Sequence, residues 1–168
     1  MIGRRPVPEA VAALRTVERR EAWGLTPEGT PLVATASALH VGSAGPASTG
    51  TASTELAWIQ IERVSWVPPR LVLTEVSEVE GQGAVRAFEL AQDSHLAEVV
   101  RTRVTSSIGW SDRRALVPTG AVRLVGRRSP GRDILDWQLV FEPGTDPHDP
   151  LLREQAEEHV RSLRRTIG

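Results

Sequence analysis

The side chains with the clearest chemical potential are arginines concentrated in one stretch of the chain. Residues 101–132 contain eight arginines and the single acid Asp112, whereas residues 71–100 contain five Glu and one Asp against only Arg86. Guanidinium groups bind carboxylates and phosphates through paired hydrogen bonds. This stretch could therefore bind an anion such as phosphate, nucleic acid or an acidic protein surface. The candidate residues are Arg113, Arg114, Arg123, Arg127, Arg128 and Arg132.

A simpler interpretation, which we favour, is that these arginines and the acidic stretch before them neutralise each other within the fold. Trp110 is the only aromatic residue interleaved with the arginines, whereas binders of single-stranded nucleic acid stack bases on aromatic side chains. All 20 basic residues of the chain are Arg, which is typical of a GC-rich genome rather than of one site. The formal net charge of −1 gives no overall attraction to nucleic acid or membranes.

Residue spacing gives no support for catalysis or metal binding. The chain has no Cys, and its four histidines lack the His-x-x-x-His spacing of a zinc site: they are His40, His95, His148 and His159. No Gly-x-Ser-x-Gly elbow is present, and Gly81-Gln82-Gly83 lacks the third glycine of a dinucleotide loop. Three carboxylates, Glu75, Glu78 and Glu80, follow one strand end but should be solvated. We expect no enzymatic activity, no cofactor and no metal.

The hydrophobic pattern predicts short antiparallel strands followed by a helix. A helix should begin near Pro8-Glu9, followed by strands at residues 18–25, 31–35, 54–67, 71–76 and 84–90, with Leu39 and Val41 continuing the pattern between them. Residues 42–53 contain only Gly, Ser, Ala, Thr and Pro, so we expect the most mobile loop there. Asp93 or Ser94 should cap an amphipathic helix over residues 94–107, with a stripe that runs from Leu96 towards Ile108.

The last third predicts a β-β-α unit, with a further strand at 108–117 leading into it. Residues 121–128 and 135–142 should form a hairpin joined by a type II turn at Ser129-Pro130-Gly131-Arg132. The apolar residues Leu135, Trp137, Leu139 and Phe141 alternate with a set expected to face water: Asp136, Gln138, Val140 and Glu142. A helix should start at Asp149-Pro150, with a Glu157–Arg161 pair on its solvent side and one apolar stripe made of Leu152, Ala156, Val160, Leu163 and Ile167.

Residues 18–107 resemble the bacterial pleckstrin-homology-like family. The segment LVATASALHV and the later ELAWIQIERVSW match the family's strand signatures at Thr35, Leu39, Val41, Ile61 and Val64. The resemblance implies a strand meander closed by a helix, and an interaction or scaffold role. Lipid-binding members hold a headgroup with clustered bases in the first hairpin loop. Here that loop, residues 26–30, contains Glu28 and no base, and residues 109–168 lie outside the resemblance.

Together these patterns predict an α+β fold: a pleckstrin-homology-like antiparallel meander closed by an amphipathic helix, then a β-hairpin plus a C-terminal helix. We expect residues 1–168 to unfold as one cooperative unit, with the 109–168 extension packed on the meander and all five Trp in the core. No run of about 18 apolar residues is present, and Pro6, Pro8 and Glu9 interrupt a signal-like start, so we expect a cytoplasmic protein.

The most favoured function is a non-enzymatic interaction or scaffold module, with a protein partner or self-association. Two alternatives remain open. One is an electrostatic binder of nucleic acid or anionic lipid that uses the arginine-rich hairpin. The other is a small hydrolase without a recognisable motif.

Overall fold

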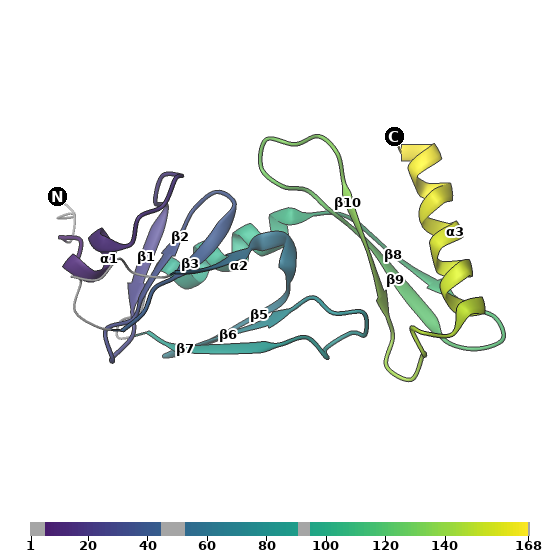
Figure 1. Ribbon diagram of the computed structural model, residues 1–168, viewed down its shortest axis with the longest axis horizontal. Helices are drawn as coiled ribbons and strands as arrows, with labels where there is room; N and C mark the ends of the chain where they lie inside the picture. The colour runs from purple at the N-terminus through teal and green to yellow at the C-terminus, as the bar shows by residue number, and fades with distance from the viewer. Residues whose placement is uncertain (1–5, 45–52, 91–94, 168) are drawn as a thin grey trace. The chain divides into compact units, whose positions relative to one another are not determined.

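The computed structural model describes residues 6–44, 53–90 and 95–167. Within these residues the chain is α+β, with three antiparallel sheets and three α-helices (Figure 1). The predicted α+β class is therefore confirmed. The chain divides into two compact units: Met1–Trp58 with Val64–Val72 and Ala87–Arg103, and Ile59–Arg63 with Leu73–Arg86 and Val104–Gly168.

The first unit contains a helix, α1 (Glu9–Ala13), and a four-stranded meander. The strands follow each other in the sheet in chain order: β1 (Ala22–Leu25), β2 (Pro31–Ala34), β3 (Ala38–Val41) and β4 (Thr54–Ala57). Val11 and Leu14 of the helix region pack against Val33, with Trp23 and Leu25 beside them. Gly29 turns β1 into β2 with a φ of +88°, a conformation that glycine adopts without steric cost.

β1 begins at Ala22, so the predicted strand start at Glu18 is wrong. Glu18 has another structural role, because its carboxylate accepts hydrogen bonds from the Ser37 hydroxyl (2.6 Å) and the Ser37 backbone N–H (2.9 Å). Thr35, buried in the same turn, bonds to Ala38, and its carbonyl accepts the indole N–H of Trp58 (3.0 Å). The polar residues between β2 and β3 therefore form a tight turn held by hydrogen bonds.

A 3-10 turn, η1 (Trp58–Gln60), interrupts the strand predicted over residues 54–67. The second sheet follows it, with order β5-β6-β7: β5 (Ile61–Val67), β6 (Arg70–Glu75) and β7 (Val85–Glu89). Helix α2 (His95–Ser107) comes next and buries Leu96, Ala97, Val100 and Val104. The expected cap at Asp93 or Ser94 lies outside the described residues, as does most of the 42–53 loop. Ile108 begins the next strand, as the strand predicted over residues 108–117 requires, and is exposed rather than part of the helix stripe.

The third sheet and the last helix belong to the second unit. Its strand order is β10-β9-β8, formed by β8 (Ile108–Ala115), β9 (Ala121–Arg127) and β10 (Asp136–Phe141). Helix α3 (Pro150–Ile167) packs on one face of this sheet. The core between them comprises Leu116, Val122, Leu124, Phe141, Leu152, Ala156 and Val160, with Trp137, Leu139 and Leu163 at its border.

Local signals position this β-β-β-α unit largely as the sequence predicts. Gly131 has a φ of +73°, and the Arg132 N–H bonds to the Ser129 carbonyl at 3.2 Å, as a type II turn requires. Asp149 caps α3 by accepting the N–H groups of Leu151 (2.9 Å) and Leu152 (3.2 Å). These two devices fix the hairpin register and the start of the helix.

Three side-chain predictions in this unit are wrong. Val140 is buried rather than solvated, because residues 78–80 hydrogen-bond to Phe141 beside it. Arg161 pairs with Glu158 at 2.8 Å, not with Glu157. Of the five Trp, only Trp58 is fully buried, and Trp110 is 41% exposed, so the prediction that all five lie in the core fails at Trp110. Cooperative unfolding of residues 1–168 stays a prediction, as does packing of the extension on the meander.

Candidate functional site

Alternation along β9 separates two sets of side chains on the third sheet. Val122 and Leu124 pack into the core under α3. Because successive residues of a strand point to opposite faces, Arg123, Val125 and Arg127 lie on the other face. The pairings Arg123↔Val140 and Val125↔Gln138 place β10 side chains beside them.

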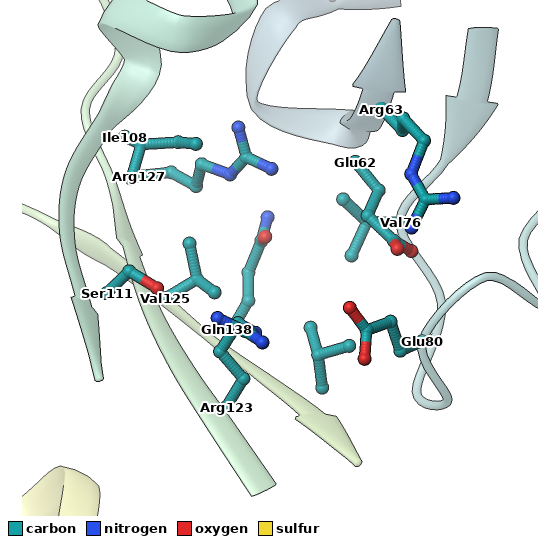
Figure 2. A pocket seen from close by; sticks show the side chains of 11 residues that line it. Glu62, Arg63, Val76, Glu80, Ile108, Ser111, Arg123, Val125, Arg127 and Gln138 are labelled. Atoms are coloured by element: carbon teal, nitrogen blue, oxygen red, sulfur yellow. The ribbon is translucent and has the colours of Figure 1, made fainter. Parts of the chain in front are cut away.

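A pocket of about 200 Å³ lies on this second face, within the second unit. Figure 2 shows Arg127 and Gln138 on one side of it and the carboxylates of Glu62 and Glu80 on the opposite side. The lining residues are Glu62, Arg63, Val76, Glu80, Ile108, Ser111, Arg123, Val125, Arg127, Gln138 and Val140.

Hydrogen bonds hold the opposite wall against the hairpin. The Gln138 amide donates to the Ile59 carbonyl (2.8 Å), and the Glu80 N–H donates to the Phe141 carbonyl (2.9 Å). The Glu62 carboxylate accepts the Gly81 N–H at 3.2 Å. The wall is therefore fixed at both ends, and the pocket is a built feature of the unit.

Arg127 is the most unusual residue of the pocket, because its charged side chain is only 3% exposed. Its Nη1 donates to the Ser107 hydroxyl (2.8 Å) and the Val104 carbonyl (3.4 Å), and its Nη2 donates to the Ile61 carbonyl (3.0 Å). All three acceptors are neutral, and two of them belong to the C-terminal end of α2, where a positive charge is favourable. Burial lowers the pKa of Arg127, with Glu62 acting in the opposite direction.

Two buried polar atoms of the pocket have no hydrogen-bond partner among the described residues. They are the Nε of Arg127, a donor, and the Oε1 of Gln138, an acceptor. Buried polar atoms are nearly always paired in proteins. An unpaired donor and an unpaired acceptor therefore mark this pocket as a candidate binding site, which a ligand reaches once the side chains that shield these two atoms from solvent move aside.

The pocket also has an excess of positive charge. Arg63, Arg123 and Arg127 line it against Glu62 and Glu80. Within the described part of the chain, no carboxylate forms an ion pair with any of these three arginines. The charge of Arg123 acts at longer range, where it helps to lower the pKa of Glu142.

The structure separates the six predicted arginines into three groups. Arg123 and Arg127 share the pocket. On β8, Arg113 bonds to Glu142 (2.9 Å) and Arg114 pairs with Asp112 (2.8 Å), so both are neutralised. That pairing raises the pKa of Arg113 and lowers the pKa of Glu142. Arg128 and Arg132 are exposed and lie outside the pocket.

Sequence reasoning did not identify Arg63, Glu62 or Gln138 as pocket residues. The hairpin turn and its register could have revealed Gln138, because they place it on the same face as Arg123 and Arg127. The wall at residues 59–63 gives no such signal, because a 3-10 turn sets its direction. Of the three carboxylates considered earlier, Glu75 bonds to Arg86, Glu78 pairs with Arg153, and only Glu80 reaches the pocket.

Among the residues that the structure describes, no cluster of three His, Cys, Asp or Glu side chains could hold a metal ion. No described helix is long and apolar enough to cross a membrane. Comparison with known proteins gives no match, since no family model, curated protein or solved structure is significantly similar to this chain.

Proposed function

We propose that this chain is a non-enzymatic binding module whose pocket takes a phosphate group displayed by a partner protein. The observation that carries the proposal is Arg127: a buried guanidinium with a free Nε and no carboxylate partner, beside a second unpaired arginine. A buried charge is costly unless an opposite charge compensates it. A bound oxyanion supplies that charge and accepts charge-assisted hydrogen bonds from Arg127 Nε and Arg123.

Gln138 favours phosphate over carboxylate. Its free Oε1 needs a donor, and an ionised carboxylate can only accept. A phosphate monoester has a second pKa of about 6, so a fraction keeps one P–O–H near neutral pH. A singly protonated phosphate accepts from Arg127 and donates to Gln138 at once.

The size of the pocket favours a group rather than a whole cofactor. Its volume of about 200 Å³ is below the roughly 300–1,000 Å³ of pockets that enclose drug-sized ligands. A phosphate on an exposed side chain could enter while the rest of the partner stays outside.

A protein partner fits the charges better than nucleic acid or lipid. Nucleic-acid binding requires several phosphate contacts along an extended positive surface, and here Arg113 and Arg114 are neutralised by their own acids. The first hairpin loop has one acid and no base, which disfavours capture of a lipid headgroup there.

Kinship with the pleckstrin-homology-like family over residues 18–107 is part of the proposal. Its support is the element order: seven antiparallel strands in two meanders, β1–β4 and β5–β7, followed by α2. The resemblance implies an interaction or scaffold role, which agrees with a binding module. The hydrolase alternative gains no observation from the described residues.

Calorimetric titration with inorganic phosphate tests the pocket, with sulfate and acetate at matched ionic strength as comparisons. We expect phosphate to bind more tightly than either, because only phosphate offers the donor that Gln138 needs. Arg123→Gln should weaken phosphate binding by roughly tenfold, the value of one charge-assisted hydrogen bond. The exposed Arg128→Gln is the matched control and should bind as the wild type does.

The proposal fails if phosphate does not bind, or if Arg123→Gln and Arg128→Gln reduce binding equally. A phosphoserine peptide, vesicles that contain a phosphoinositide and an RNA oligonucleotide then separate the classes of partner. Tighter binding of RNA, with a steep salt dependence, or of vesicles would refute the protein partner.

A further inference from the structure

β8 is the edge strand of the β10-β9-β8 sheet and the longest strand in the described residues. Seven of its eight residues are exposed, and Asp112 is half-buried. Within the described part of the chain, β8 pairs with β9 alone. An edge of this length offers a row of backbone groups to another strand.

Proteins commonly protect such edges with charged side chains or a bulge. Here the protection is incomplete. A register shift between Ile108 and Trp110 disturbs only the start of the strand, and pairing with β9 is regular from Trp110 to Ala115. The charges of Arg113 and Arg114 are neutralised within the same molecule, by Glu142 and Asp112.

We propose that a second copy of this chain pairs with β8 through its own β8, in antiparallel register about Arg113. A twofold axis normal to the sheet keeps each face continuous, so opposing residues must have the same parity. In the register centred on Arg113, Asp112 faces Arg114 of the second copy, and Arg114 faces Asp112 of the second copy. By symmetry, both contacts join an Asp to an Arg.

Charge complementarity selects this register over its neighbours. Each of the three registers sets one like-charged pair opposite itself: two Asp112 carboxylates, two Arg113 guanidinium groups or two Arg114 guanidinium groups. Only the register centred on Arg113 adds two contacts between opposite charges. In the chosen register Arg113 faces its own copy on the other face, but each Arg113 already bonds to Glu142 at 2.9 Å. Trp110 lies on the face of Asp112 and Arg114 and is 41% exposed.

The pairing joins two three-stranded sheets into one of six strands. It is a small contact, well below the roughly 1,200–2,000 Å² of stable interfaces. We therefore expect a weak dimer whose population rises with concentration. The interface does not depend on the phosphate pocket, so either proposal can fail alone.

Sedimentation velocity from about 10 μM to about 1 mM measures the dimer, with circular dichroism to confirm that each variant is folded. Asp112→Arg places Arg against Arg114, and Arg114→Asp places Asp against Asp112. Each change turns two attractive pairs into two repulsive ones, so each variant alone should dimerise about tenfold more weakly. Arg128→Asp is the control for net charge and should behave as the wild type.

An equimolar mixture of Asp112→Arg and Arg114→Asp is the decisive arm. In the mixed dimer every 112–114 contact again joins Arg to Asp, so association should return to within about threefold of the wild type. Recovery in the mixture supports the register. The proposal is overturned if the wild type is monomeric at about 1 mM, if neither variant weakens the dimer, or if the mixture does not recover.

Discussion

Arg127 and Arg113 show how surroundings decide what a guanidinium group does. Arg113 is exposed and bonds to Glu142, which raises the pKa of Arg113. Arg127 is buried among neutral acceptors, and burial lowers its pKa. The first arrangement pairs the charge directly with a carboxylate, whereas in the second no described carboxylate forms an ion pair with the guanidinium group, and Glu62 acts only at longer range. Only the second leaves a polar atom free for a ligand.

Glu18 provides a residue-scale prediction about acid stability. Hydrogen bonds from the Ser37 and Thr35 side chains are the main causes that hold the pKa of Glu18 below its ordinary value of 4.5. A carboxylate with a depressed folded-state pKa adds stability above its unfolded pKa and loses it as the pH falls through the folded pKa. Stability from Glu18 should therefore be complete above about pH 5, decline as the pH falls below 4.5 and be gone below the folded-state pKa.

Glu18→Gln should lower the free energy of unfolding by about 1 kcal/mol near neutral pH, as loss of a turn cap does. Urea unfolding at about pH 7, pH 5 and pH 3 should show a smaller wild-type advantage at the lowest pH. Glu28→Gln, in a neighbouring turn, is the control and should change little. An advantage of the wild type that persists undiminished at about pH 3 would contradict this account of Glu18.

The elements form where local signals agree, and the sequence predicts those well. Asp149-Pro150 starts α3 and Pro130-Gly131 closes the β9–β10 hairpin, because capping and turn chemistry act over a few residues. Val140 and the wall at residues 59–63 depend on contacts distant in sequence. Propensity and alternation carry no information about such contacts. The sequence could therefore place the two β9 arginines on one face of the strand, but it could not predict the pocket.

The turn between β6 and β7 contains two glycines that should differ in how much a side chain destabilises the fold. Gly81 has a φ of +75°, with open space where a Cβ would be. A Cβ on Gly83 would meet the Glu75 carbonyl oxygen at 1.7 Å, which requires the backbone to move. Gly81→Ala should cost about 1 kcal/mol, for the strained dihedral. Gly83→Ala should cost about 3 kcal/mol or more, because the clash is with backbone.

Thermal and urea unfolding of both variants measures the difference. Equal costs, or a greater cost for Gly81→Ala, would show that the close approach of Gly83 to Glu75 does not constrain this turn.

For the whole molecule, the connectivity of the two units bears on cooperativity. Each unit is built from three separate stretches of chain, and the division falls within η1, β5, β6, β7 and α2. No single cut therefore releases an intact unit. A fragment that ends at Ser107 lacks the hairpin groups, Arg127 and Gln138, that bond to Ile61 and Ile59.

We therefore expect one unfolding transition for the full chain and a molten or insoluble fragment after truncation at Ser107. Trp137→Ala should cost about 3 kcal/mol, the lower end for a core aromatic, because Trp137 borders the core under α3 without being fully buried. Far-UV circular dichroism and tryptophan fluorescence should give coincident urea curves, since cooperative units unfold together by every probe. Two separated transitions, or a 1–107 fragment that melts cooperatively, would show instead that residues 109–168 are an independent appendage. The loss of stability in Trp137→Ala would then appear in one transition only.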